Sequence, residues 1–404
     1  MKSNIFLIQA GYRGKNYVKE AVNKTFSDGA ILRPMNKKDE NIDIVNFLLE
    51  KKKIKLFDSQ LYFPENNLTN AKMLEYSYFK NNFAKNYTQD SFEQKTFREK
   101  VCKEIIEFQD YIKTDAYLSP SKFIHVYSET DLKSYLELSR IFIDQIKEKN
   151  TEKPCLVSLP IASGVISDEQ NRTSLLNYLT GLDCEGFYIL FSSDIGEGYP
   201  LANTTDIINL MQLIYTLKKN KYYVLVGYSH HISYLLSCSG VDGYAIGYYK
   251  NLRCFDPKSQ RKIKSKSRRP AINYFSTAIL NDLRAETDVK MLMSKDSKFN
   301  INTIKSNSPY ESSLFHKTDL PSVWGEKDSY NHYLWCCHNL LQKQKDKTAK
   351  EKILNVETQI QNSRKTNELI KKSGLPKKDF DKLYDSWWTA LQEFKKTIDE
   401  EVTS

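Results

Sequence analysis

Short apolar runs recur along the chain, and each is closed by Gly, Pro, Ser or Asp. Runs of this length with such boundaries are typical of buried β-strands. We therefore predict strands at Ile5–Gln9, Ala30–Arg33, Ile54–Phe57, Tyr117–Leu118, Cys155–Leu159, Gly186–Phe191, Tyr222–Val226 and Gly243–Ile246.

Amphipathic stretches lie between many of these runs. In SDEQNRTSLLNYLTGLD, Ser167 is the expected N-cap, with Gln170 three residues later and Gly181 at the end. Strands that alternate with helices indicate parallel βαβ units. About eight strands within some 280 residues favour an α/β fold of the (β/α)8 TIM-like barrel type. A doubly wound sheet is the alternative, although the sequence has no GxGxxG or Walker motif.

The pattern divides the chain into residues 1–320, the barrel, and residues 321–404, a helical C-terminal region. A charged, aromatic helical insertion is expected within the barrel at about residues 70–114. The last helix carries one apolar stripe, which predicts docking on the barrel or on a second chain, the latter giving a homo-oligomer. The stripe consists of Phe380, Leu383, Trp387, Leu391, Phe394 and Ile398.

Composition indicates a binding partner and a cellular compartment. The 404 residues carry a net charge of +10, and residues 250–269 hold nine Lys or Arg against one Asp. This excess predicts contact with a nucleic acid backbone, the alternative being a solvated loop. Seven scattered cysteines show no disulfide framework and no CxxC pair, so a reducing cytoplasm is expected. No apolar run reaches membrane length, and the N-terminal NIFLIQAG reads as a strand rather than a signal segment.

Candidate chemistry follows from the barrel, because catalytic groups lie at the C-terminal ends of its strands. The polar, hydroxylic and aromatic residues there suit an uncharged planar ligand such as a flipped nucleobase. Asp58 and Asp194 are the candidate catalytic carboxylates, and capping of loops or helices is their alternative role. His230 is either a proton donor to the leaving base or a loop-bonding residue. The candidate base-binding residues are Arg33, Ser59, Gln60, Ser158, Ser193, Tyr228, His230, Tyr249 and Asn251.

Residues 28–255 resemble the tRNA-guanine transglycosylase superfamily. The stretch DSQLYF, beginning at Asp58, is similar to the family motif DSGGFQ with its essential aspartate. CLVSLPIASGVISDEQNRTSLLNYL, EGFYILFSSDIGEGYP, YYVLVGYSHH and GVDGYAIGYYKNLR follow in the family's order and at similar spacing. The resemblance implies a TIM barrel acting on a base in a nucleic acid. It also implies that Asp242, in GVD, points toward the surrounding helices.

The departures from the family change the expected reaction. Ala245 occupies the position of the family's nucleophilic aspartate, and LFSS replaces the Gly-Gly pair that admits guanine. The zinc motif is absent, and Cys336, Cys337 and His338 are read as ordinary helix residues, so no metal or cofactor is expected. The chain is most similar to the DNA-acting branches, in particular bacterial anti-phage glycosylases that remove modified bases. A base transglycosylase and a catalytically inactive nucleic-acid-binding relative are the alternatives.

The expected partner is double-stranded DNA with the target base flipped out. Hydrolysis would leave an abasic site. The residues expected to contact the nucleic acid are Lys250, Arg253, Lys258, Arg261, Lys262, Lys264, Lys266, Arg268 and Arg269.

Overall fold

The computed structural model describes residues 2–11, 13–84, 87–193, 202–257, 271–294, 297–315, 324–375 and 380–403. The chain forms two compact units. The first consists of Met1–Gly198, Gln212–Ser229 and Gly240–Ile263, and the second of Tyr199–Met211, His230–Ser239 and Lys264–Ser404.

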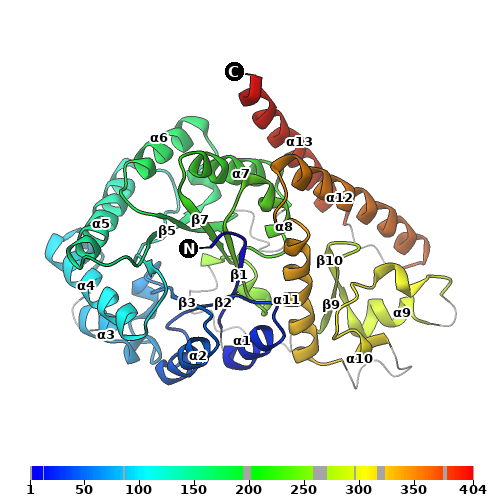
Figure 1. Cartoon of the computed structure of the whole chain (residues 1–404), viewed down its shortest axis with the longest axis horizontal. Coiled ribbons are helices and arrows are strands. Elements are labelled where there is room, and N and C mark those ends of the chain that lie inside the picture. Colours follow the sequence, from blue (N-terminus) through cyan, green and yellow to red (C-terminus); the bar gives the residue numbers. More distant parts are fainter. Residues whose placement is uncertain are drawn as a thin grey trace. The chain divides into compact units, whose positions relative to one another are not determined.

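The first unit is a nearly closed barrel of eight parallel strands (Figure 1), in the order β3-β2-β1-β8-β7-β6-β5-β4. Beside β4, the backbone N–H of Asp115 donates to the carbonyl of Lys55 at 2.9 Å, which bridges the remaining gap. The predicted α/β barrel is therefore confirmed. The strands are β1 (Ile5–Gln9), β2 (Gly29–Leu32), β3 (Ile54–Phe57), β4 (Tyr117–Leu118), β5 (Cys155–Ala162), β6 (Gly186–Ser192), β7 (Tyr223–Gly227) and β8 (Gly243–Ile246).

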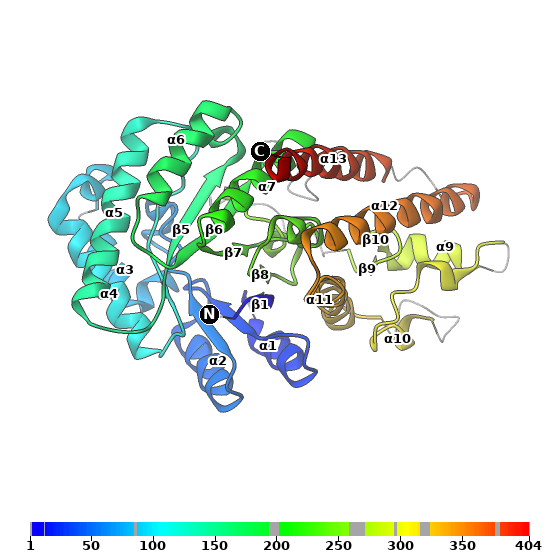
Figure 2. The ribbon, with the colours of Figure 1, turned by 45° about the horizontal axis from the view of Figure 1, so that its top comes forward.

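Helices follow the strands and lie outside them (Figures 1 and 2). They bury their apolar faces against a sheet that is itself buried on both sides, as parallel sheets require. The predicted helical insertion is present as α3 and α4, and α7 contributes residues to both units. The helices are α1 (Gly14–Asn23), α2 (Lys38–Glu50), α3 (Ser77–Phe83), α4 (Lys95–Tyr111), α5 (Glu129–Glu148), α6 (Glu169–Thr180) and α7 (Thr204–Lys219).

Two local predictions are corrected. Asp168, not Ser167, caps α6, and its Oδ1 accepts from the backbone N–H groups of Gln170 and Asn171 at 2.9 and 3.0 Å. Strand β5 continues through Pro160 to Ala162, beyond the expected end at Leu159. A proline is tolerated there because its carbonyl still accepts from Ile124, whose own carbonyl accepts from the N–H of Ala162.

The second unit combines a hairpin with helices. The antiparallel pair β9 (Asn273–Ser276) and β10 (Asn281–Arg284) is not predicted by the sequence pattern. Helices α12 and α13 run side by side (Figures 1 and 2), and the described part of the predicted apolar stripe is buried. The helices of this unit are α8 (Ser233–Leu236), α9 (Lys290–Leu292), α10 (Ser312–Phe315), α11 (Glu326–Gln342), α12 (Ala349–Lys372) and α13 (Asp381–Thr403).

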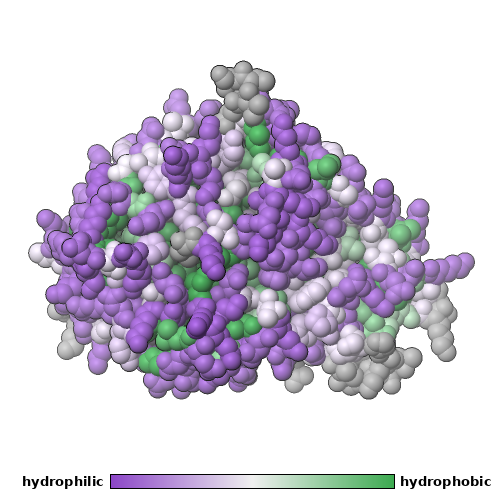
Figure 3. All heavy atoms as spheres, viewed as in Figure 1, coloured by the Kyte–Doolittle hydropathy of each residue, from purple (hydrophilic) through white to green (hydrophobic). Residues whose placement is uncertain are grey.

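One face of the molecule is mainly polar. Hydrophilic residues cover most of the face drawn in Figure 3, and the apolar areas on it are small and separate. Among the described residues, the exposed large apolar side chains are scattered along the sequence, at Leu49, Tyr111, Val126, Met291, Leu354 and Leu369. Single exposed apolar residues of this kind are ordinary on a protein surface.

Candidate active site at the C-terminal ends of the barrel strands

Asp58 lies directly after β3, on the face of the strand that points into the barrel. In the register, Gln9 pairs with Ile31 and Ile31 with Leu56, and Asp58 is two residues beyond Leu56. Registered residues of parallel strands share a face, and side chains two residues apart do too. Asp58 is buried, with 3% of its surface exposed. The carboxylate therefore sits inside the C-terminal end of the barrel, where TIM-barrel enzymes place their catalytic groups.

A tight turn fixes one oxygen of this carboxylate. Asp58 Oδ1 accepts from the backbone N–H of Gln60 at 2.9 Å and from the hydroxyl of Tyr62 at 2.7 Å. Gln60 has a φ of 52°, in the left-handed region that non-glycine residues seldom occupy. Asp58 Oδ2 accepts no hydrogen bond from the described residues. One oxygen is thus held in place while the other is left for a ligand or for water.

The surroundings change the acidity of Asp58. Burial raises its pKa from 3.8 to about 6, against the opposing effects of the Tyr62 and Gln60 hydrogen bonds and the Arg33 charge. Desolvation disfavours the charged carboxylate, and hydrogen-bond donors and cations favour it. A carboxyl group tuned toward neutral pH inside a barrel mouth is a candidate for acid–base or electrostatic catalysis.

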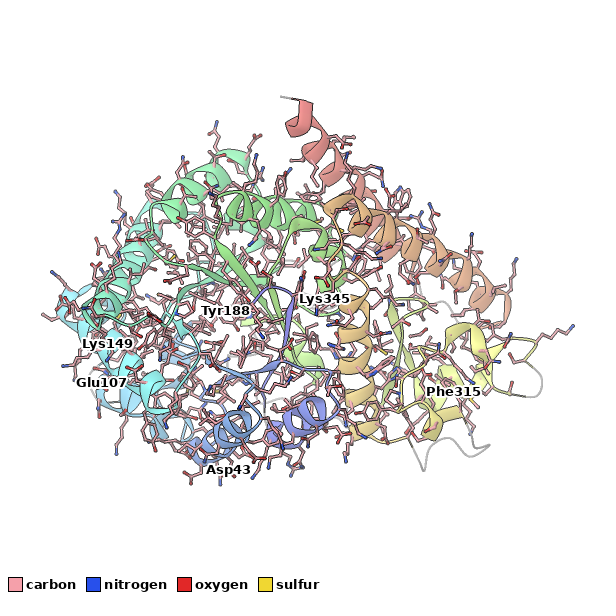
Figure 4. The ribbon with its side chains drawn as sticks, in the orientation of Figure 1. Asp43, Glu107, Lys149, Tyr188, Phe315 and Lys345 are labelled. Carbon is pink, nitrogen blue, oxygen red and sulfur yellow. The ribbon has the colours of Figure 1, made fainter. Side chains whose placement is uncertain are left out.

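Residues from several strands converge on this carboxyl group. The Nε2 of Gln60 donates to the hydroxyl of Tyr228, which follows β7, at 2.9 Å. On β6, the hydroxyl of Tyr188 donates to Gln9 Oε1 at 3.1 Å, and Figure 4 shows Tyr188 among the barrel strands. We call the set Gln9, Arg33, Asp58, Gln60, Tyr62, Tyr188, Tyr228 and Phe255 the Asp58 site.

Aromatic rings line one side of the Asp58 site. The ring of Phe255 lies 5.2 Å from that of Tyr62 and 5.8 Å from that of Tyr228, centroid to centroid. Phe123 is 5.8 Å from Phe255 and 5.3 Å from Phe63. Phe63 and Phe123 are half-buried, whereas the other three rings are buried. This wall suits a flat ring better than a flexible aliphatic chain.

Four buried polar atoms of the site make no hydrogen bond with the described residues. A buried polar atom without a partner costs about 1–3 kcal/mol, so a bound ligand or water that pairs with it is stabilised there. Two are donors and two are acceptors when Asp58 is ionised. They are Gln9 Nε2, Arg33 Nε, Asp58 Oδ2 and Gln60 Oε1.

Of the residues predicted from the sequence, the structure brings Arg33, Asp58, Gln60 and Tyr228 together. Three others lie in the surrounding framework or at the surface. Ser193 is half-buried, and the next residue that the structure describes is Ala202. Ser59 offers its carbonyl to the hydroxyl of Tyr78, and the hydroxyl of Ser158 donates to the carbonyl of Ser119 at 2.7 Å. Asn251 is exposed.

Two tyrosines follow β8, and they differ in burial. Tyr248 is fully buried, accepts from the N–H of Gly11 at 3.0 Å and stacks on Tyr17. The predicted base-binding residue Tyr249 is half-buried, and its ring contacts those of Tyr17 and Tyr248. Arg253 is buried, and its Nε donates to the carbonyl of Tyr248 at 3.4 Å.

His230 belongs to the second unit, unlike the residues of the Asp58 site. Its ring is buried and lies 4.2 Å from that of His231 and 5.8 Å from that of Tyr333. A further seven predicted nucleic-acid contacts and Asp194 lie outside the described residues, as does the side chain of Lys250. Those seven are Lys258, Arg261, Lys262, Lys264, Lys266, Arg268 and Arg269.

The two β8 positions singled out by the resemblance have different surroundings. Ala245 is buried and registers with Leu7 and Gly227, which places it on the barrel's inner face. Asp242 pairs with Lys218 of α7 at 2.5 Å, which confirms that it points toward the helices. Its carboxylate also accepts from the backbone N–H of Val224 at 2.8 Å, so it stabilises the opposite end of the barrel.

Sequence reasoning missed four members of the Asp58 site: Gln9, Tyr62, Tyr188 and Phe255. Gln9 carried a signal, because it is the only polar residue of the strand IFLIQ. Tyr62 follows Asp58 by four residues, within the same turn-rich segment. Tyr188 looks like an ordinary core residue, and Phe255 lies in a loop, so neither carried a local signal.

Among the described residues, no group of three or more His, Cys, Asp or Glu could hold a metal ion. In the part of the chain that the structure describes, none of the helices combines the length and apolarity needed to cross a membrane. No protein-family model matches the chain, and no curated protein matches it.

Proposed function

We propose that this protein is a DNA glycosylase that hydrolyses the N-glycosidic bond of a base, modified in the natural substrate, flipped out of double-stranded phage DNA. On this proposal it is a DNA-acting member of the tRNA-guanine transglycosylase superfamily that serves antiviral defence. The observation that carries the proposal is the arrangement of Asp58, buried at a strand end with Oδ1 fixed and Oδ2 accepting no hydrogen bond from the described residues.

The chemistry of base removal matches such a carboxylate. As the C1′–N bond breaks, its electron pair leaves with the base, and positive charge develops on the sugar. Asp58 Oδ2 would stabilise that charge or accept a proton from the attacking water, whose oxygen forms the new bond to C1′. The products are the free base, protonated at the released nitrogen, and an abasic site.

The rest of the site supports a planar, uncharged substrate. Tyr62, Tyr228 and Phe255 offer ring faces and edges for a base, and the glutamine amides offer hydrogen bonds to its edge. The basic stretch at residues 250–269 supplies charge for the phosphate backbone. Aromatic rings combined with glutamine amides favour a nucleobase over a lipid.

The transglycosylase alternative requires a second carboxylate to form a covalent sugar intermediate. Ala245 cannot supply one, and it lies on the inner face of β8. The remaining candidate, Asp194, lies outside the described residues. Hydrolysis needs only one carboxylate and water, so we expect no covalent DNA–protein adduct in denaturing gels of quenched reactions. An adduct that disappears in Asp194→Ala would support the transglycosylase instead.

Mass spectrometry of small molecules released from modified and unmodified phage DNAs tests the proposal. Wild-type protein should release one kind of base and generate abasic sites in equal number. Asp58→Asn should lower the rate by two to four orders of magnitude, about 3–5 kcal/mol, while DNA binding persists.

Asp242→Asn is the matched control, because Asp242 is a buried carboxylate in the same barrel that pairs with Lys218. Its variant should retain base release when folded. Release of a base at equal rates by wild type and Asp58→Asn would contradict the assignment of Asp58. Failure of the wild type to release any base, with DNA binding retained, would favour the inactive, nucleic-acid-binding alternative.

A further inference from the structure

Gln9 is a polar residue in an otherwise apolar, fully buried strand. Its side chain has no exposed surface and lies on the inner face of the barrel. Tyr188, three strands away in the sheet order, donates its hydroxyl to Gln9 Oε1 at 3.1 Å. Gly227 makes room for this contact, because a Cβ there would come within 2.6 Å of the Tyr188 ring and hydroxyl.

The Tyr188 hydroxyl therefore fixes the orientation of the Gln9 amide within the barrel. Oε1 is occupied, and Nε2 donates to none of the described residues. A buried amide N–H without an acceptor lowers the stability of the folded chain. A ligand that brings an acceptor to Gln9 Nε2 would remove this cost.

Gln109 is the informative comparison within the same unit. It is equally buried, but its Nε2 donates to the carbonyl of Leu118 at 3.0 Å, and its Oε1 accepts from the N–H of Leu118 at 2.9 Å. Both halves of that amide are satisfied by backbone beside β4. Gln109 is thus explained by the fold alone, whereas Gln9 is not.

We propose that Gln9 selects the ligand of the Asp58 site by donating its Nε2–H to a carbonyl oxygen on the ring, and that Tyr188 is the positioning residue that holds Gln9 in this orientation. The identification of this ring as a nucleobase rests on the proposed function. Arg33 Nε is a second donor without a partner among the described residues. A carbonyl oxygen has two lone pairs and accepts from two donors, whereas a ring nitrogen has one.

Gln60 complements Gln9. Its Nε2 is held by the Tyr228 hydroxyl at 2.9 Å, and its Oε1 accepts no hydrogen bond from the described residues. One glutamine therefore presents a donor and the other an acceptor, each fixed by a tyrosine. The pair fits a ring that carries a carbonyl group and an N–H group.

Binding of the four 2′-deoxynucleosides, measured by isothermal titration calorimetry and ligand-observed NMR, tests the inference. Wild-type protein should bind at least one of thymidine, deoxycytidine and deoxyguanosine more tightly than deoxyadenosine, which has no carbonyl on its base. Gln9→Leu should weaken that binding at least tenfold and abolish the preference. Tyr188→Phe should reduce the difference in affinity between the nucleosides, because the Gln9 amide can then rotate.

Gln109→Leu is the matched control and should show the opposite pattern. It removes two hydrogen bonds to backbone and should lower the melting temperature while preserving the order of nucleoside affinities. Gln9→Leu should lower the melting temperature less, because it leaves only the Tyr188 hydroxyl without its acceptor and also removes an unpaired amide N–H. The inference would be overturned by an unchanged order of affinities in Gln9→Leu, by a fall in its melting temperature as large as that of Gln109→Leu, or by a wild type without the preference.

The same variants separate this inference from the proposed hydrolysis. Gln9-dependent nucleoside selection without base release from any DNA would retain the inference and reject the glycosylase. Base release by wild type that Asp58→Asn abolishes, with nucleoside selection unaffected by Gln9→Leu, would retain the glycosylase and reject the inference.

Discussion

At the scale of single residues, the burial of Asp58 lowers the stability of the folded protein at neutral pH. Asp58 is buried in an environment that opposes its ionisation, and its pKa is raised from 3.8 to about 6. Between these values the folded protein binds more protons than the unfolded chain, so stability falls as pH rises through this window. The difference corresponds to about 3 kcal/mol above pH 6, at about 1.4 kcal/mol per pH unit.

Asp58→Asn should therefore stabilise the protein at neutral and alkaline pH. The amide keeps an acceptor for Gln60 and Tyr62 but carries no charge. Urea unfolding at pH 8 should show a gain of up to about 3 kcal/mol, which shrinks as the pH approaches 4. Asp242→Asn, which breaks the ion pair with Lys218, should instead destabilise. Equal stability of wild type and Asp58→Asn at pH 8 would show that burial of the ionised Asp58 carboxylate does not destabilise the folded protein.

Tyr62→Phe should move the pH dependence of base release. The Tyr62 hydroxyl donates to Asp58 Oδ1 at 2.7 Å and lowers the pKa of that carboxyl group, so its removal should raise the pKa further. If the ionised form is active, the acidic limb of the rate profile moves to higher pH, and the loss is largest near pH 6. Tyr78→Phe is the control, since the Tyr78 hydroxyl donates to the carbonyl of Ser59 instead. An identical shift in both variants would point to a general structural effect.

At the scale of elements, α6 shows how a local signal can be assigned one residue too early. Both Ser167 and Asp168 are capping residue types, and both precede the apolar face of the helix. Ser167 Oγ donates to the carbonyl of Gly164, and the Asp168 carboxylate accepts from the N–H groups of Gln170 and Asn171. An ionised carboxylate also interacts favourably with the N-terminal end of the helix dipole.

Asp168→Ala should therefore cost about 1 kcal/mol of unfolding free energy. Ser167→Ala should cost clearly less, because the cap remains. Thermal or urea unfolding of the two variants measures the difference directly. A larger loss in Ser167→Ala than in Asp168→Ala would restore Ser167 as the cap.

At the scale of the whole molecule, charge is the property that links the chain to its proposed partner. The net charge is +10, and residues 250–269 account for nine basic residues against one acid. Binding to phosphates releases counterions, so the logarithm of the binding constant falls with the logarithm of salt concentration by about 0.9 per neutralised phosphate. The charge of this stretch should therefore govern affinity rather than sequence preference.

Neutralising Lys262, Lys264, Lys266, Arg268 and Arg269 together should weaken binding to all DNA sequences alike. The salt slope should become shallower by about 0.9 for each phosphate that the variant no longer neutralises. Fluorescence anisotropy across a salt series measures both effects. Neutralising Lys100, Lys103 and Lys113 of the helical insertion and its following turn is a suitable control, because these residues lie outside the basic stretch. An unchanged slope would show that the stretch does not bind phosphate.

The sequence by itself determined the eight strands of the barrel and the position of Asp58 at the end of one of them. Each strand is a local apolar run, and runs such as Ile54–Phe57 and Gly243–Ile246 coincide with β3 and β8 residue for residue. Asp58 could be found because the carboxyl ends of parallel strands meet at one end of a barrel, wherever the strands lie in the sequence. Alternation and length are local properties, so they can be read without knowledge of the tertiary structure.

Only the tertiary structure decided which side chains meet. The Tyr188–Gln9 bond joins residues 179 positions apart, and the Gln60–Tyr228 bond joins residues 168 apart. Both depend on register and on which face of each strand points inward, and these are fixed by closure of the barrel rather than by any local pattern. The apolar stripe of the C-terminal helix gives a further example. Its spacing could be read in the sequence, but only the fold of the second unit shows that α13 packs along α12.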